Sequence, residues 1–449
     1  MATITIIGAA STTFGPKVLC DLVNHPQLAG STVRLVDTNE QRLAIYHRLA
    51  QRVLEHVAHD YTLEATTDRC AALPGSDHVL IAVDVRHYDL WQQDFAIPVK
   101  HGIRQVTGEL GGPGGLFHSL RQIPLHLDIA RDVARLAPQA MVMVMSNPLN
   151  RICLAMHRHV PGLGQVVGLC HGVEITHQFV FSKVLGVDAE DIESTAAGTN
   201  HFTWVLDLRR KSTGEDLYPA VREKINQLDA NRECLARKLF ETYGHYPACG
   251  DGHTGEYLPY AHEFVGLEGP PFDRAHQAEH DRWRRLDELS RTGDRDALAE
   301  FLRPRSWVDT LAFPIMAAIA SHQLHRMPAV NVVNRGAIDN LPADVFIEAP
   351  GVVDASGLRA IHIGPLPRQL APFNRRDIDQ TELIVDAAIT GERRRVLQAM
   401  LLDPVVDSIA AAERIVDEML TTQAPYLPQF QGARERTVAP ATEVGARNA

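Results

Sequence analysis

Residues 3–15 read TITIIGAASTTFG, in which a β-branched run ends at Gly8 and a turn of small residues leads to Gly15. Apolar side chains at helical spacing follow over residues 18–23. A strand, a tight turn and a helix in this order are the setting of a dinucleotide-binding loop, because amide groups at the start of the helix can bind a pyrophosphate. Ala10 stands where the usual pattern has its second glycine, so this motif alone is incomplete.

A second strand is expected at residues 33–36, and it ends at Asp37. An acid in this place can accept hydrogen bonds from the ribose hydroxyls and repels a 2′-phosphate, which favours NAD over NADP. The alternative is that Asp37 only caps the next helix. We expect the dinucleotide to contact Gly8, Ala10, Ser11, Thr12, Phe14, Asp37, Val83 and Asn147.

Further apolar strands are expected at residues 78–83 and 140–145, with helices between them. Because alternating strands and helices imply right-handed crossovers, residues 1–165 predict a Rossmann-like, doubly wound parallel sheet that binds NAD. The longer, mixed segments of residues 166–430 predict an α+β domain that binds metal and substrate, in an α/β architecture like that of lactate and malate dehydrogenases. Residues 431–449 lack periodicity and predict a flexible tail.

Within the second domain, a strand is expected near residues 202–208. The stretch 330–365 is rich in Val, Gly and Pro and predicts loops and short strands. Helices are expected at residues 220–243, 279–303 and 378–421.

The chain of 449 residues has a formal charge of −11 and is 45% hydrophobic, which is typical of a globular protein with two domains. Its densest basic clusters, residues 282–285 and 393–395, lie in helical segments beside acids, so we expect solvated helix faces and no nucleic-acid partner. The N-terminus does not resemble a signal peptide, and no apolar run reaches the roughly 20 residues that span a bilayer. We therefore expect a cytoplasmic protein without membrane contact, whose six cysteines are thiols.

Two short motifs place a cysteine and a histidine at the ends of strands. Residues 166–173, VVGLCHGV, end an apolar strand at Cys170, and residues 197–202, AGTNHF, hold His201 in a turn before another strand. A thiolate and an imidazole suit a borderline divalent ion, and two protein ligands leave coordination positions for a substrate. From these residues alone, a buried thiol and a core histidine are the alternative.

Several further blocks accompany these two motifs. The set comprises IPVKHG at 97–102, GGPGG at 111–115, GLCH at 168–171, AGTNH at 197–201, IGPLP at 363–367 and LLDPV at 401–405. Together the blocks resemble glycoside hydrolase family 4, and the likeness covers residues 3–420. Lactate and malate dehydrogenases share the SNP element at 146–148 but not the other blocks. The NAD-dependent family 4 enzymes depart from the two-carboxylate mechanism of most glycosidases.

The resemblance implies that Cys170 and His201 hold Mn²⁺ or a similar ion and that Asn147 contacts the sugar hydroxyls. It also implies that NAD takes a hydride from C3 of the sugar, which makes the C2 proton acidic. A base removes that proton, the C1 leaving group departs by elimination, water adds, and NADH returns its hydride. The family usually forms dimers or tetramers, so we expect a homodimer or homotetramer.

The elimination needs a base near C2 and an acid near the leaving oxygen. The segment 250–257, GDGHTGEY, gathers titratable groups between glycines, and Asp251 is the first choice for the base, with Tyr257 the second. The alternative is a turn that caps a helix starting near Gly255. His171 matches a variable position of the family motif and is the candidate for the acid or for a sugar contact.

Glu109 falls where the family carries an acidic residue that reaches the active site, and the alternative is a surface acid. His118 and Arg121 follow at the start of a helix, where they either contact the substrate or only order the loop. The expected substrate contacts are Asn147, Asn150, His118, Arg121 and His253.

Phosphoglucosidases of the family carry an arginine upstream of the IPxxHG element to bind the 6-phosphate, and Trp91 stands at that position here. The expected substrate is therefore an unphosphorylated hexoside or hexuronide, in α linkage, and the chain looks closest to the α-galacturonidase branch. One alternative is an NAD-dependent 2-hydroxy-acid dehydrogenase, which needs no metal and consumes its cofactor. Another is a non-catalytic NAD-sensing protein, which would tolerate the loss of Cys170.

Overall fold

The computed structural model describes residues 1–57, 60–303 and 310–431. Within them, the strands form one twelve-stranded sheet in the order β3-β2-β1-β4-β5-β6-β10-β11-β7-β8-β9, with β12 paired to β11. The strands are β1 (Thr3–Ile7), β2 (Thr32–Val36), β3 (Thr62–Thr66), β4 (His78–Ile81), β5 (Met141–Val144), β6 (Val166–Gly168), β7 (Ile192–Thr199), β8 (Phe202–Arg210), β9 (Tyr246–Ala248), β10 (His325–Val333), β11 (Phe346–Asp354) and β12 (Gly357–Ala360).

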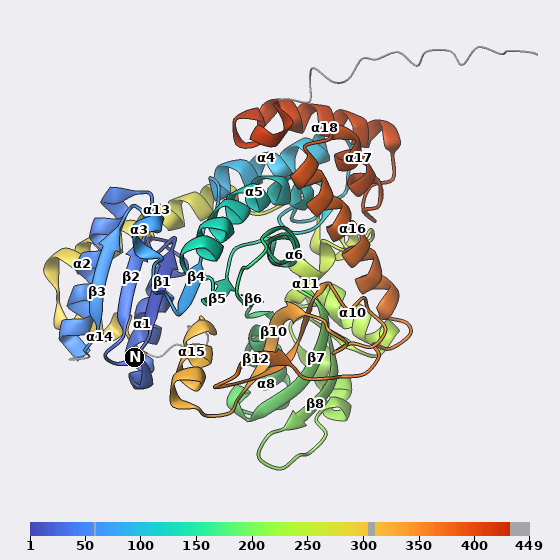
Figure 1. The fold of residues 1–449 in the computed structure, drawn as a ribbon. Helices are drawn as coiled ribbons and strands as arrows, with labels where there is room; N and C mark the ends of the chain where they lie inside the picture. The colour runs from blue at the N-terminus through green and yellow to red at the C-terminus, as the bar shows by residue number, and fades with distance from the viewer. Residues whose placement is uncertain (58–59, 304–309, 432–449) are drawn as a thin grey trace, which may run out of the picture.

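Strands β1 to β6 form the parallel half of this sheet, in the order 3-2-1-4-5-6 of a Rossmann domain. The β-branched residues of β1 are buried on both faces, since Ile4 and Ile6 join one apolar core and Ile7 joins the other. Helices α1 (Gly15–Asn24) and α2 (Glu40–Val57) cover the first face, and α5 (Gly112–Leu136) and α6 (Leu149–His159) the second. The predicted doubly wound parallel sheet is confirmed (Figure 1).

Strand β6 joins the parallel half to an antiparallel half. It pairs in parallel with β5 and antiparallel with β10, where Asn331 lies opposite Gly168. The sheet then continues antiparallel through β11, β7, β8 and β9. The boundary predicted before residue 166 thus falls at the strand where the sheet changes direction, and the sheet itself is continuous across it.

The expectation of loops and short strands over residues 330–365 is confirmed for the loop at 334–345 and the short β12, but it is wrong for the two longer strands. β10 and β11 are long strands in the interior of the sheet, and both carry residues that usually interrupt strands. Pro328 lies where the β10–β11 register shifts, between Met327 and Val330, so the bulge accommodates it. Gly351 faces Val330 so closely that a Cβ would lie 2.7 Å from its Cγ2, and the glycine therefore permits the pairing.

Helices from the second half of the chain cover the first half. Helix α13 (Phe272–Thr292) packs beside α2, where Leu286 enters the same core as the α2 residue Leu49. Helices α16 (Ala371–Thr390), α17 (Arg393–Leu401) and α18 (Ile409–Thr422) join the core formed by α5 and α6, and Figure 1 shows α18 above α4 and α5. The two halves of the chain therefore share both apolar cores.

The helices predicted at residues 220–243 and 279–303 each consist of two helices, α9 with α10 and α13 with α14, and the alternative helix start near Gly255 lies at Gly250 instead. Residues 432–449, which hold most of the predicted tail, lie outside the described residues. No helix in the described part of the chain is long and apolar enough to cross a membrane. The other helices are α3 (Arg69–Ala72), α4 (His87–Lys100), α7 (Gly172–Thr176), α8 (Ser182–Leu185), α9 (Tyr218–Lys224), α10 (Cys234–Tyr243), α11 (Gly250–Gly255), α12 (His262–Val265), α14 (Arg295–Phe301) and α15 (Ala312–Ser321).

Candidate active site

The turn between β1 and α1 is fixed by a close approach of backbone to backbone. Gly8 has a φ of +85°, and a Cβ on it would lie 2.2 Å from the carbonyl oxygen of Ala82. Its amide donates to the Val36 carbonyl over 2.9 Å, and the amide of Phe14 donates to the Ser11 hydroxyl over 3.2 Å. Only glycine fits this place, so the turn holds the start of α1 against the end of β2.

Asp37, at the end of β2, orders the same turn from the other side. Its carboxylate accepts hydrogen bonds from the amide of Ala10 over 3.1 Å and from the amide of Asn39 over 2.9 Å. A cavity of about 870 Å³ opens over this turn. All the residues predicted to contact the dinucleotide line it, namely Gly8, Ala10, Ser11, Thr12, Phe14, Asp37, Val83 and Asn147.

Cys170 and His201 meet at the centre of the sheet. Cys170 follows β6, and His201 lies in the turn between β7 and β8 with a φ of +62°. The Cys170 Sγ lies 3.0 Å from His201 Nε2. The two residues that the sequence predicts as metal ligands are therefore neighbours in space.

The surroundings of Cys170 favour its thiolate form. A hydrogen bond from the Cys249 thiol, with the nearby His201 ring, holds the pKa of Cys170 well below its usual range in spite of burial. Burial lowers the pKa of His201, but the Cys170 thiolate outweighs burial and raises that pKa to about 9. A thiolate is the form of cysteine that binds a metal, so Cys170 is prepared to act as a ligand.

A buried oxygen beside the pair also fits a bound cation. Asn150 is buried, and its Oδ1 has no hydrogen-bond partner within the described residues. It lines a small pocket together with His201 and Tyr257. A carbonyl-type oxygen, a thiolate and an imidazole together suit a borderline divalent ion, and Asn150 would serve equally as a hydrogen-bond acceptor for a sugar hydroxyl.

The segment 250–257 contributes two side chains to the same place. The His253 ring stacks on the His201 ring with centroids 4.6 Å apart. The Tyr257 hydroxyl donates to the Asn200 carbonyl over 3.4 Å, and its ring stacks on Phe202 with centroids 4.9 Å apart. His253 and Tyr257 therefore lie beside the predicted metal ligands.

Asp251, the first choice for the base, faces another way. Its carboxylate accepts hydrogen bonds from the amides of Leu235 over 3.1 Å and Ala236 over 2.8 Å, so it caps the start of α10. The side chains of Asp251 and His253 leave the short helix α11 in different directions, and only His253 reaches His201. In this structure Asp251 is therefore engaged at the start of α10, and its role as the base stays a prediction.

Arg121, predicted as a substrate contact, is buried in an ion pair. Its guanidinium forms a buried ion pair with Asp94 at 2.5 Å and also donates to Gln423 over 2.7 Å. The side chains of Arg121 and Asp94 are each only 1% exposed. Arg121 therefore ties α5 to α4 and to the end of α18, and it does not face the cavity as a substrate contact would.

The loop that carries Glu109 is anchored by Glu256, whose Oε2 accepts the amides of residues 109–111 over 2.7–3.1 Å. Glu109 itself lines the dinucleotide cavity. His118 donates from Nδ1 to the Glu109 carbonyl over 2.9 Å, so it orders this loop. His171, which follows Cys170, is half-buried at the start of α7.

Two residues of the site escape prediction from the sequence. Cys249 hydrogen bonds to Cys170, and Glu348 is fully buried, where its carboxylate accepts from Asn331 over 3.1 Å and from Thr203. Burial, together with the nearby Cys170 thiolate, raises the pKa of Glu348 to about 7. The one signal for Glu348 is an acid inside an apolar run, VFIEAP, at residues 345–350.

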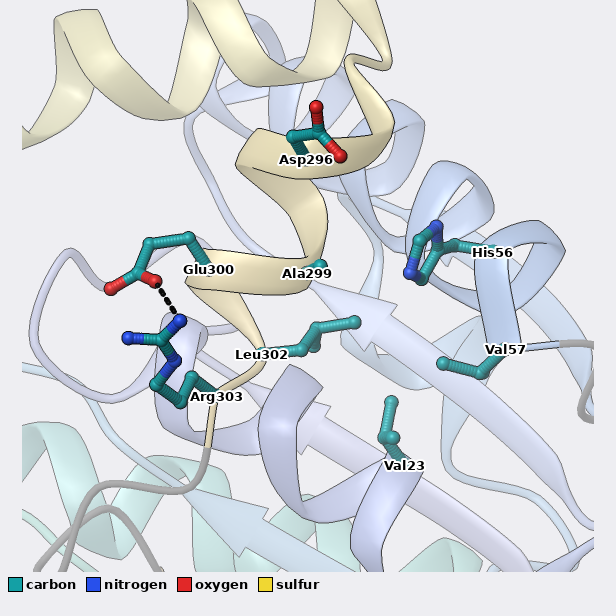
Figure 2. A pocket seen from close by; sticks show the side chains of 8 residues that line it. All are labelled: Val23, His56, Val57, Asp296, Ala299, Glu300, Leu302 and Arg303. Atoms are coloured by element: carbon teal, nitrogen blue, oxygen red, sulfur yellow. Dashed lines mark ion pairs between the residues drawn. The ribbon is translucent and has the colours of Figure 1, made fainter.

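A separate hollow of about 610 Å³ lies between α14 and the ends of α1 and α2 (Figure 2). Its one drawn ion pair joins Glu300 to Arg303 at 3.0 Å. No residue of the predicted site lines it, so it is not part of the candidate active site. The lining residues are Val23, His56, Val57, Asp296, Ala299, Glu300, Leu302 and Arg303.

Comparison with known proteins agrees with this arrangement. The family 4 glycosyl hydrolases match residues 3–186, and the C-terminal domain of that family matches residues 196–406. An alpha-glucosidase from Erwinia rhapontici is 33% identical in an alignment 457 positions long, which covers 95% of this chain and 99% of the relative. An alpha-galacturonidase from Bacillus subtilis is 28% identical over 447 residues, 93% of this chain and 96% of the relative.

Solved structures share the fold over nearly the whole chain. A 6-phospho-alpha-glucosidase from gut microorganisms, in complex with NAD and Mn²⁺, has a TM-score of 0.83 at 21% identity and covers 96% of this chain and 100% of its own. A malate dehydrogenase from Plasmodium falciparum is more distant, with a TM-score of 0.52 at 11% identity over 88% of this chain and 100% of its own. Since both halves match the family and the glucosidase relative covers almost the full length, the chain belongs to glycoside hydrolase family 4.

Proposed function

We propose that this enzyme cleaves the O-glycosidic bond of an unphosphorylated α-hexoside or α-hexuronide, with NAD in the cavity over Gly8 and Mn²⁺ or a similar ion at Cys170 and His201. One observation carries the proposal. Asn147 lines the dinucleotide cavity, and Asn150, three residues later in the first turn of α6, lines the pocket that holds His201. A sugar bound at this junction would meet both the cofactor and the metal ligands.

The two bound groups would supply the chemistry that side chains lack: NAD accepts a hydride from C3, and the divalent ion polarises the neighbouring sugar oxygens. The chain positions the sugar. Asn147 and Asn150 offer amide groups to its hydroxyls, and His253 forms a wall over His201. Glu109 lines the cavity from the opposite loop.

Tyr257 is the base in this proposal. Its hydroxyl donates to the carbonyl of Asn200, which precedes His201 in the chain, and a sugar held by an ion at His201 would bring C2 near this hydroxyl. Burial raises the pKa of Tyr257 well above its ordinary value, and a cation at His201 would lower it again. We assign one of two roles to His171, beside Cys170: it donates a proton to the leaving oxygen, or it contacts the sugar.

The preference for an unphosphorylated sugar rests on the charges around the cavity. Trp91 donates from Nε1 to the Thr107 carbonyl over 3.0 Å, and this indole stands where phosphoglucosidases carry an arginine. The arginines of the cavity wall are each paired with acids: Arg42 with Glu279, Arg69 with Asp128 and Asp132, and Arg86 with Asp89. A phosphate dianion would have to compete with those carboxylates.

The test is release of 4-nitrophenol from a panel of 4-nitrophenyl α- and β-hexosides, the 6-phosphates of these hexosides, and 4-nitrophenyl hexuronides, under reducing conditions. NAD and Mn²⁺ are each omitted in turn. We expect release only from unphosphorylated α-glycosides, with both additions required and no net NADH. Turnover without metal, or release from the 6-phosphates alone, would overturn the proposal, and NADH formed mole for mole with product would favour the 2-hydroxy-acid dehydrogenase.

A further inference from the structure

The side chains of Asp84, His87 and His118 gather at the edge of the dinucleotide cavity. Asp84 follows β4, His87 begins α4, and His118 lies in the second turn of α5. One ligand atom from each, a carboxylate oxygen and two ring nitrogens, lies within 4.8 Å of both others. Asp84 and His87 also line the cavity, so the cluster is open to it.

The hydrogen bonds fix which nitrogen of His118 carries a proton. His118 Nδ1 lies 2.9 Å from the Glu109 carbonyl, which can only accept, so Nδ1 must donate. In a neutral ring Nε2 then carries a lone pair, and this atom faces Asp84 Oδ2 at 3.5 Å. Gln122 Nε2 lies 3.4 Å from the same nitrogen, a long hydrogen bond, and also donates to Asp84 Oδ1. A cation between His118 Nε2 and Asp84 Oδ2 would bind both of these acceptors.

The carboxylate is held ready for a cation. The Asp84 side chain is 27% exposed and lines the cavity, so a cation can reach it. His87 Nδ1 lies 2.6 Å from Asp84 Oδ2, and Gln122 donates to Oδ1. Gln122 is fully buried, and its own Oε1 has no hydrogen-bond partner in the described part of the chain, so the polar groups around Asp84 are not fully satisfied.

This arrangement is that of a metal site with its supporting shell. A histidine that ligates a metal usually donates its other ring N–H to a carbonyl or a carboxylate, as His118 does to Glu109. Two imidazoles and one carboxylate suit Zn²⁺ or a neighbouring first-row ion, and three protein ligands leave a position open. The His87 side chain is 31% exposed, so that open position faces the cavity.

We propose that Asp84, His87 and His118 bind a second divalent cation, of the Zn²⁺ type, separate from the ion at Cys170 and His201. It ties the segment after β4 to the start of α5 at the cavity edge, and its open position accepts water or a ligand hydroxyl. The proposal does not depend on the function proposed above, because its ligands are different residues.

The test counts metal ions per chain. The full-length protein is stripped with a chelator, dialysed against micromolar Zn²⁺, freed of loosely bound metal by gel filtration and analysed for zinc. A parallel titration with Co²⁺ reports thiolate ligation through its near-ultraviolet charge-transfer band, which the Cys170 site can give and a site made of Asp84, His87 and His118 cannot. We expect two zinc ions per chain, with d–d absorption from both sites and the charge-transfer band from one.

The variants Asp84→Asn and His87→Gln should each lose one zinc ion and keep the thiolate band. Both side chains are partly exposed, so neither substitution is expected to prevent folding. Circular dichroism checks that each variant is folded, and two independent variants keep the test valid if one of them is not. The matched control is Asp339→Asn, which removes the acid of an exposed pair in which His362 Nε2 lies 2.9 Å from Asp339 Oδ1 without a third ligand. This variant should keep two zinc ions.

Cys170→Ser separates the two sites. It should lose the thiolate band and retain the zinc ion that Asp84→Asn loses. If the parent protein shows no thiolate band, the zinc ion that Asp84→Asn loses should still be present in both the parent and Cys170→Ser. Zinc retained in full by both Asp84→Asn and His87→Gln would overturn the proposal, and would leave a proton on His118 as the charge that faces Asp84.

Discussion

The Sγ of Cys170 lies 3.0 Å from Nε2 of His201, although β10 and β11 lie between the strands that these residues follow. Neighbouring strands are about 4.8 Å apart, so adjacency in the sheet does not bring the residues together. The left-handed turn at His201, with a φ of +62°, directs its ring back over the strand ends. The contact therefore depends on the geometry of that turn.

Replacement of the thiolate should remove metal-dependent activity. Cys170→Ser is expected to weaken Mn²⁺ binding by more than about 100-fold, since loss of an outer-shell partner alone costs about 10- to 100-fold. Electron paramagnetic resonance of free Mn²⁺ measures the affinity. Cys234→Ser is the control, because Cys234 lies at the start of α10 and should bind Mn²⁺ as the parent does. Unchanged Mn²⁺ affinity in Cys170→Ser would remove Cys170 from the metal site.

Two variants should separate the candidates for the base. Tyr257→Phe is expected to lower kcat by about 100- to 10,000-fold, the usual contribution of a general base, with little change in folding stability. Asp251→Asn should instead lower stability by about 0.5–2 kcal/mol, because it weakens the cap of α10, and should keep most of its kcat. Rates of 4-nitrophenol release and urea unfolding measure both. The reverse pattern would return the role to Asp251.

Asp37 should control the choice of cofactor. Asp37→Ala removes the acceptor for the ribose hydroxyls and for the Ala10 amide, so NAD binding should weaken by about 10-fold or more while NADP binding improves. Titration calorimetry with both cofactors tests this. Asp68→Asn is a suitable control, since Asp68 lines the same cavity but caps α3 by accepting from the Cys70 amide over 2.8 Å. An unchanged NAD-to-NADP ratio in Asp37→Ala would count against the assignment.

The Arg121–Asp94 ion pair should matter for stability rather than for substrate binding. Arg121→Gln leaves Asp94 buried without its charged partner, which typically costs about 3–5 kcal/mol. Urea unfolding should show this loss, and the folded fraction should keep the parent KM. A raised KM at unchanged stability would restore Arg121 as a substrate contact.

Glu348 should make the metal-free protein less stable as the pH rises. Its pKa is about 7 when folded and near 4.5 when unfolded, so the folded state holds a proton more tightly between these values. Stability from this residue is complete below the unfolded pKa and is lost as the pH rises to about 7, by roughly 3 kcal/mol in total. Glu348→Gln should flatten this part of the curve in urea unfolding across pH 4.5–7.5. The same slope in both proteins would contradict the assignment.

The sequence predicts the features that local chemistry determines. The β-branched run before Gly8 and the acid at Asp37 are sufficient to predict the first two strands of the Rossmann half. Gly8 marks the end of the first strand, because the turn that joins β1 to α1 permits only glycine there. The pairing of Cys170 with His201 came from the family resemblance, since spacing along the chain does not reveal it. Each of these predictions rests on one short segment or on a pattern shared with known proteins.

Features that depend on long-range packing were missed. Pro328 and Gly351 read as strand breakers, but a bulge and a close contact with Val330 accommodate them inside β10 and β11. Because β11 was not predicted, Glu348 could not be placed beside the predicted metal ligands Cys170 and His201. Asp251 and Tyr257 lie on one short segment, and only the direction of α11 decides which of them faces Asn200.

The most direct test of the account follows hydrogen at C2 of the sugar. An α-glycoside that the enzyme cleaves is turned over in D₂O with NAD and Mn²⁺, and the product sugar is analysed by proton NMR. Removal of the C2 proton and later addition of water should leave deuterium at C2, with no deuterium at C3, because the hydride returns from the cofactor. A product that keeps its hydrogen at C2 would contradict oxidation and elimination, and would indicate direct displacement at C1.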